Sequence, residues 1–114
     1  MTGDPISPAE LVLILVTVPN DAVADRIAHA LVVEQLAACV NVVPGVRSIY
    51  KWEGEICNEG ELQCLVKTRR SLFPAVRDRV RALHPYQIPE IIALPLVEGH
   101  SEYLDWVRAN TRSG

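Results

Sequence analysis

Cys39 and His84 are the side chains in this sequence best suited to holding a metal ion. A thiolate and an imidazole are ligands that copper and zinc prefer, so these two residues predict a soft-metal site with Cu or Zn as the bound ion. An alternative stays open for each residue. A free cysteine in an apolar strand is usually a small buried hydrophobe, and a histidine at the end of a helix can serve only as a structural cap.

The remaining cysteines do not complete a metal or disulfide motif. With Cys57 and Cys64 the chain has an odd set of three cysteines and no C-x-x-C pair. This spacing argues against a disulfide framework and against a closed tetrahedral zinc site. We therefore expect free thiols.

Two clusters of charge could also bind ions. Four glutamates crowd residues 53–61, where they could hold a hard cation or supply an acid–base pair, the alternative being a solvated hairpin. Basic residues follow between 67 and 81. Within that stretch Lys67 and Arg70 are the candidates for holding a small anion in a cleft between subunits, although such residues also often only cover a helix surface.

Four aromatic residues are candidates for contacts between subunits. Aromatic side chains with a polar group suit partly buried interfaces, and packing in the core of the subunit is the alternative. These residues are Tyr50, Trp52, Tyr86 and Trp106.

Apolar periodicity predicts the strands and helices that must position these side chains. Pro44-Gly45 is expected to kink the second strand, and Pro95 to place the last strand at a sheet edge. The expected strands are 11–16, 36–52, 61–68 and 90–97, and the expected helices begin at Asn20 or Asp21, at Ser71 and at Ser101.

This order predicts an α+β fold of the ferredoxin-like type, a βαβ-βαβ sandwich with a long central hairpin and a C-terminal helix. Two helices would cover one face of a four-stranded antiparallel sheet. The last helix can hide only part of the other face. The long second strand, the protruding hairpin and the many apolar strand residues favour burial of the rest against other subunits.

Length and charge limit the classes of function. A chain of 114 residues suits one domain, expected over residues 11–110, with a flexible segment 1–10 and a tail 111–114. A net charge of -3 gives no general attraction to nucleic acid or to an anionic membrane surface. With no secretory signal at the start and no apolar run of the roughly 20 residues that a bilayer requires, a cytoplasmic protein is expected.

Four stretches resemble the CutA family, the divalent-cation tolerance proteins, and the resemblance extends over residues 11–110. It implies a ferredoxin-like subunit assembled by strand pairing into a homotrimer similar to the PII signal-transduction proteins. It also implies a non-enzymatic role in tolerance to divalent metals, copper above all. The stretches are Ala37-Ala38-Cys39-Val40-Asn41, Tyr50-Lys51-Trp52-Glu53-Gly54, His84-Pro85-Tyr86 with Pro89-Glu90-Ile91-Ile92, and Tyr103-Leu104-Asp105-Trp106.

The resemblance transfers only part of a metal site. Copper-binding members of the family look as if they use a cysteine at the end of the first strand. They also look as if they use two consecutive histidines directly before the Pro-Tyr pair. This sequence has Val16 at the first position and Leu83-His84 at the others. Only His84 therefore carries over.

Two other functional classes remain open. A PII-like sensor would bind a small anionic metabolite in clefts between subunits, but no phosphate-binding glycine loop supports it. An enzyme has a precedent in acylphosphatases of the same topology, yet no nucleophile and base can be assigned from spacing. We expect a binding protein without catalytic activity.

Overall fold

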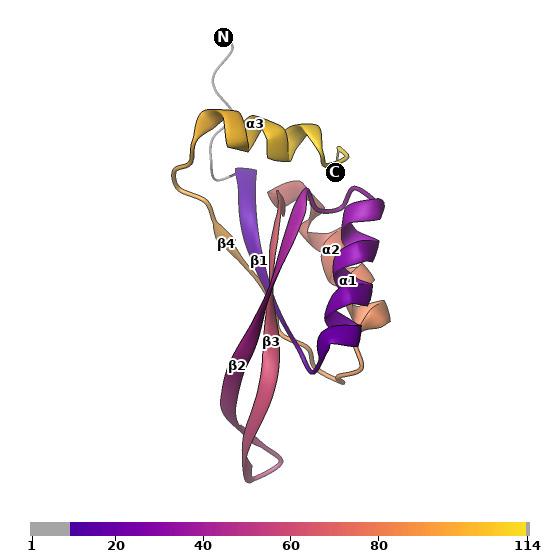
Figure 1. Ribbon diagram of the computed structural model, residues 1–114, viewed down its shortest axis with the longest axis vertical. Coiled ribbons are helices and arrows are strands. Elements are labelled where there is room, and N and C mark those ends of the chain that lie inside the picture. Colours follow the sequence, from indigo (N-terminus) through magenta and orange to yellow (C-terminus); the bar gives the residue numbers. More distant parts are fainter. Residues whose placement is uncertain (1–9, 114) are drawn as a thin grey trace.

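The computed structural model describes residues 10–113 of the chain. Its elements are β1 (Leu11–Val18), α1 (Asp21–Val33), β2 (Cys39–Trp52), β3 (Glu55–Arg69), the 3-10 turn η2 (Arg70–Leu72), α2 (Phe73–Leu83), β4 (Ile91–Pro95) and α3 (Ser101–Ala109). The strands form one antiparallel sheet in the order β2-β3-β1-β4, with α1 and α2 on one side and α3 across one end (Figure 1). The α+β, ferredoxin-like prediction is confirmed. No helix within the described residues is long and apolar enough to span a membrane.

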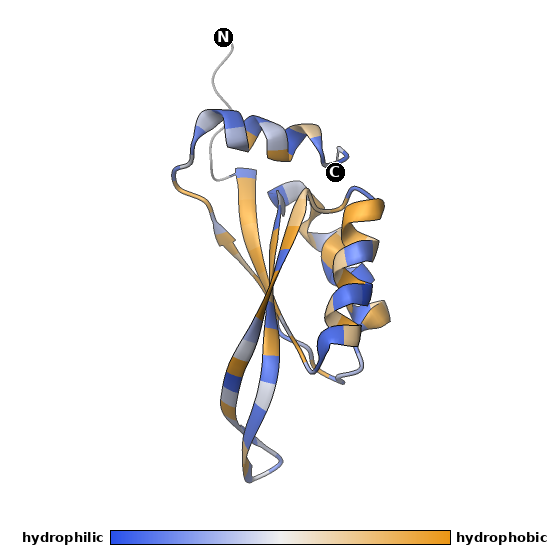
Figure 2. Cartoon of the chain, in the orientation of Figure 1, coloured by the Kyte–Doolittle hydropathy of each residue, from blue (hydrophilic) through white to orange (hydrophobic). Residues whose placement is uncertain are grey.

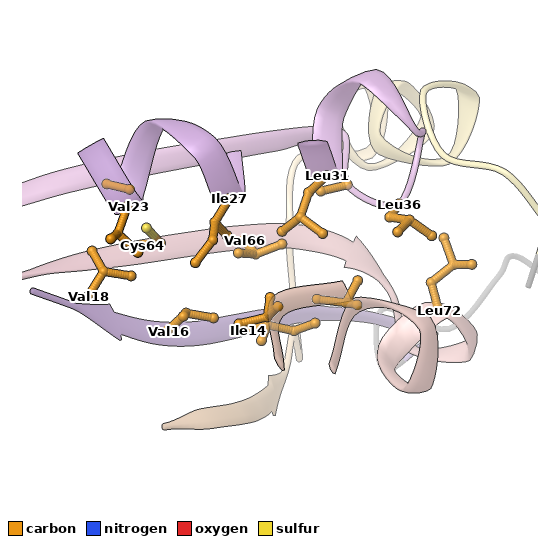
Figure 3. Packing of buried hydrophobic residues seen from close by; sticks show 14 of the residues in the cluster. Ile14, Val16, Val18, Val23, Ile27, Leu31, Leu36, Cys64, Val66 and Leu72 are labelled. Atoms are coloured by element: carbon orange, nitrogen blue, oxygen red, sulfur yellow. The ribbon is translucent and has the colours of Figure 1, made fainter. Parts of the chain in front are cut away.

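An apolar core fills the space between the sheet and the helices α1 and α2 (Figure 3). Successive side chains of a strand face opposite sides of the sheet, so every second residue of β1 points into this core. Ile14 and Val16 are completely buried there. Ile27 and Leu31, one turn apart on α1, pack against the same layer. The hydrophobic position at Val16 is therefore used for packing.

The start of α1 agrees with the sequence prediction, and the start of α2 does not. Asn20 caps α1, because its side chain accepts the Val23 N–H at 2.9 Å. Ser71 caps no helix. It lies within η2, which buries Leu72, and α2 then begins at Phe73 without a side-chain cap.

The β2–β3 hairpin is longer than the sequence predicts and projects beyond the helices (Figure 1). Residues 58–60, which resemble a turn, pair with β2 instead, since cross-strand pairing overrides local propensity. The actual turn is Glu53-Gly54, where both residues have positive φ, as a two-residue hairpin turn requires. The predicted kink at Pro44-Gly45 is confirmed as a register shift between Val43 and Val46.

The sheet face opposite α1 and α2 is only partly covered. α3 packs over its end, where Leu104 and Val107 bury Leu11. Further along this face the apolar side chains of Ile92 and Leu94 on the edge strand β4 stay 50% and 47% exposed. Hydrophobic residues also alternate with hydrophilic ones along the projecting hairpin (Figure 2). We call the sheet surface beyond α3 the open face.

Candidate functional site

A pocket of roughly 740 Å³ lies between the β2–β3 hairpin, the end of β1 and the loop that joins α2 to β4. Its walls carry three aromatic rings, Tyr50, Trp52 and Tyr86, and two carboxylates, Glu61 and Glu90. Among the described residues, no lysine or arginine lines it. We call it the aromatic pocket.

Glu61 and Tyr86 form a hydrogen-bonded pair inside the aromatic pocket. The Tyr86 hydroxyl donates to Glu61 Oε2 at 2.5 Å, although the two residues are far apart in sequence. Glu61 is only 6% exposed, which is unusual for a carboxylate. Burial of the phenol, together with the hydrogen bond to Glu61, raises the pKa of Tyr86 well above its usual value. The phenol therefore stays protonated and remains a donor to the carboxylate.

Two more hydroxyl groups hold carboxylates in or beside the pocket. Thr17 Oγ1, at the end of β1, donates to Glu90 Oε1 at 3.0 Å. The Tyr50 hydroxyl donates to Glu59 across the hairpin, and this hydrogen bond raises the pKa of Tyr50. Among residues 10–113, none of these three glutamates is paired with a lysine, arginine or histidine. Their negative charge is therefore not cancelled by a neighbouring cation.

His84 is the C-cap residue of α2 and lies buried behind the aromatic pocket. Its Nε2 lies 2.7 Å from the backbone oxygen of Thr17, and its Nδ1 lies 3.1 Å from the backbone nitrogen of Tyr86. Because Nδ1 accepts the Tyr86 N–H, the ring proton is assigned to Nε2, which donates to Thr17. The imidazole also packs against the Tyr86 ring, with centroids 4.6 Å apart. A metal ion at His84 would have to displace one of these hydrogen bonds.

The second predicted ligand, Cys39, lies at a different place in the sheet. Cys39 pairs with Lys67, which pairs in turn with Leu13 on β1. Thr17, the contact of His84, is four residues further along β1, about 13 Å away at the usual strand rise. The structure thus does not bring the two predicted ligands together within a subunit. Within residues 10–113, no group of three His, Cys, Asp or Glu side chains could hold a metal ion.

The other two cysteines have contrasting surroundings. Cys64 is completely buried in the core, and this burial raises the pKa of its thiol to about 11. Its thiolate, the form that binds metals, is therefore scarce at neutral pH. Cys57 is partly buried on the hairpin opposite Tyr50. All three thiols are free, as predicted.

The predicted anion-binding residues Lys67 and Arg70 have different surroundings. Lys67 Nζ lies 5.4 Å from the centroid of the Tyr103 ring of α3, within range of a cation–π contact. Arg70 instead lines a separate hollow with Arg69 and Arg108. Arg69 belongs to the basic stretch 67–81 considered for anion binding from the sequence, whereas Arg108 lies outside it.

The four aromatic candidates fall into two groups. Tyr50, Trp52 and Tyr86 share the aromatic pocket, whereas Trp106 lies on α3, stacked on Tyr103 with ring centroids 5.6 Å apart. Trp52 and Trp106 are 41% and 44% exposed in the single subunit. Such exposure excludes the alternative that these two tryptophans belong to the core of the subunit.

Comparison with known proteins identifies relatives over nearly the whole chain. The family described as "CutA1 divalent ion tolerance protein" matches residues 12–110. The "Divalent-cation tolerance protein CutA" of Thermus thermophilus is 59% identical over 99 residues, covering 87% of this chain and 96% of the relative. Human "Protein CutA" is 46% identical over 112 residues, and the chain spans 63% of its length.

Solved structures give the same result. The structure of the divalent cation tolerance protein Cut A1 from Thermus thermophilus matches with a TM-score of 0.87 at 57% sequence identity. The match covers 90% of this chain and 99% of that one. Sequence and fold therefore agree.

Proposed function

The chain belongs to the CutA1 divalent ion tolerance family, and from that premise we propose that it is a non-enzymatic homotrimer that binds or responds to divalent metal ions such as copper or zinc. The family membership confirms the resemblance found in the sequence. The names of its relatives describe tolerance of divalent cations. Assembly and metal binding rest on separate observations.

The open face supports assembly. Large apolar side chains that are about half exposed on one contiguous sheet surface indicate a surface that is covered by another protein. Ile92 and Leu94 have this character on β4, and Val43 and Trp52, each 41% exposed, have it on β2. Both β2 and β4 are edge strands within the subunit, so each has backbone groups available to pair with a neighbouring chain.

The observation that supports metal binding is the imidazole of His84 in the His84-Pro85-Tyr86 motif, with two carboxylates nearby that no cation among residues 10–113 neutralises. An imidazole nitrogen and carboxylate oxygens are donors that zinc and copper accept. Tyr86 links His84 to Glu61, and Thr17 links it to Glu90. Since the three side chains form no metal-holding group among the described residues of one subunit, a metal ion at His84 would take further ligands from a neighbouring subunit. Of the two hydrogen bonds on the ring, the longer one, from Tyr86 N–H to Nδ1, is the more easily exchanged for a metal bond.

A calorimetric titration of the reduced protein with Zn²⁺ and Cu²⁺ tests metal binding. We expect uptake in a fixed ratio to the subunit, and a loss of affinity of at least tenfold on His84→Gln. Glutamine keeps a side-chain amide that can donate to Thr17 but lacks an imidazole nitrogen. The matched control is His29→Gln, because His29 is an exposed histidine that contacts only the Asp25 carbonyl in its own helix.

Two results would contradict the proposal. Absence of uptake above background by intact protein with reduced thiols would remove metal binding. Equal losses in the two histidine variants would place binding on unspecific surface histidines.

A further inference from the structure

A second hollow, of roughly 400 Å³, lies at the opposite end of β1 from the aromatic pocket. It is bounded by the start of β1, by η2 and by the C-terminal half of α3. We call it the arginine hollow. Its lining residues are Glu10, Leu11, Arg69, Arg70, Ser71 and Arg108.

Arg69 is fixed at this hollow without being neutralised. Its Nε donates to Thr111 Oγ1 at 2.9 Å, and its Nη2 donates to the Arg108 carbonyl at 2.8 Å. Both acceptors are uncharged. These two bonds hold the planar guanidinium in one orientation, and within residues 10–113 the remaining nitrogen, Nη1, has no acceptor.

Arg70 and Ser71 supply further donors that are not used within the subunit. Both side chains are exposed, and neither makes a hydrogen bond or ion pair with another described residue. A guanidinium and a hydroxyl therefore lie beside the fixed guanidinium of Arg69, on consecutive residues of one tight turn.

The charge at the hollow is positive although the chain as a whole carries -3. Arg108 Nη1 is paired with Asp105 at 2.8 Å. The one carboxylate among the lining residues, Glu10, forms no ion pair with another of residues 10–113. Within the described part of the chain, Arg69 and Arg70 therefore have no bonded counter-charge.

We propose that the arginine hollow binds a small phosphate-bearing anion, with Arg69, Arg70 and Ser71 as the donors. A guanidinium group can donate two parallel hydrogen bonds to two oxygens of one phosphate. Arginine is for this reason a common phosphate-binding residue. A phosphate presents several oxygens to two guanidiniums and a hydroxyl at once, whereas a single carboxylate presents two. The bound anion would link η2 to α3 through Arg69, which already contacts the end of that helix.

Isothermal titration with inorganic pyrophosphate, at constant ionic strength set with chloride, tests this proposal. We expect binding in an equimolar ratio to the subunit, weakened at least tenfold by Arg70→Gln. Arg70 is the variant of choice because its side chain is exposed and makes no hydrogen bond or ion pair with another described residue. Arg81→Gln is the control, since Arg81 is an exposed arginine on α2 that does not line the hollow. Arg70→Lys keeps the positive charge but loses the planar pair of N–H donors, and it should bind with intermediate affinity.

Three outcomes would overturn the proposal. The first is no pyrophosphate binding by the intact protein. The second is an equal loss of pyrophosphate affinity in Arg70→Gln and Arg81→Gln, which would show that the affinity depends on overall charge and not on the arginine hollow. The third is binding of citrate without binding of pyrophosphate, which would replace phosphate with carboxylate as the ligand. None of them depends on metal uptake at His84, so this test and the metal titration can fail separately.

Discussion

The two faces of the sheet differ in how completely the chain covers them. On the face toward α1 and α2, residues such as Ile14, Val16 and Val66 are entirely buried. On the open face Ile92 and Leu94 on β4 are about half exposed, and Trp52 on the hairpin is 41% exposed. One face therefore supplies the core that folds the subunit, while the other has the character of an interface with a second chain.

The largest effect should follow from removing packing on the covered face. Ile14→Ala leaves a cavity in the core, and we expect it to lower the free energy of unfolding by about 2–5 kcal/mol. Urea denaturation measures the loss. The control is Val33→Ala at the exposed end of α1, for which we expect less than about 0.5 kcal/mol. Similar losses in both variants would contradict the account of the core.

A smaller effect on the same face concerns Cys64 at high pH. Burial raises the pKa of this thiol from 9.0 to about 11, so the folded state keeps its proton longer than the unfolded state does. The contribution of the protonated Cys64 thiol to the free energy of unfolding is therefore fully present below pH 9. It is lost as the pH rises toward 11, by roughly 2–3 kcal/mol. Denaturation at pH 8 and pH 10.5 should show a smaller alkaline loss for Cys64→Ala than for the unmodified chain. Identical alkaline losses would contradict the raised pKa.

The smallest loss of stability should follow from a change in the aromatic pocket, on the open face. Tyr86→Phe removes the donor to Glu61 and should cost about 1 kcal/mol, since water entering the pocket can replace the hydroxyl. Thermal unfolding measures it, and Tyr103→Phe serves as a control because the Tyr103 hydroxyl has no hydrogen-bond partner among the described residues. A loss above about 3 kcal/mol would mean that Glu61 is sealed from water.

The sequence predicts the fold well because its signals are local. The apolar run of β1, the cap at Asn20 and the break at Pro44-Gly45 each act within a few residues, and the structure confirms all three. Pro95 at the end of β4 also lies on an edge strand, as expected. Ser71 failed as a cap because the tight turn after β3 and the burial of Leu72 decide where α2 begins.

The candidate site could be predicted only in part, because it depends on contacts between distant segments. Glu61 is one of four glutamates in an acidic hairpin, and nothing in that pattern distinguishes it from its neighbours. Its burial follows from the loop that brings Tyr86 onto β3. Likewise Arg69 and Arg108 meet only because α3 folds back over the sheet end. The cytoplasmic location stays a prediction.

Light scattering coupled to size-exclusion chromatography, applied to the unmodified chain, Ile92→Lys and Val33→Lys at equal concentration, tests the claim about the two faces most directly. We expect a trimer for the unmodified chain and for Val33→Lys, because the Val33 side chain at the end of α1 is exposed to solvent. We expect Ile92→Lys to dissociate into subunits that keep their helical circular dichroism. A monomeric unmodified chain, or an Ile92→Lys protein that remains as trimeric as Val33→Lys, would contradict it.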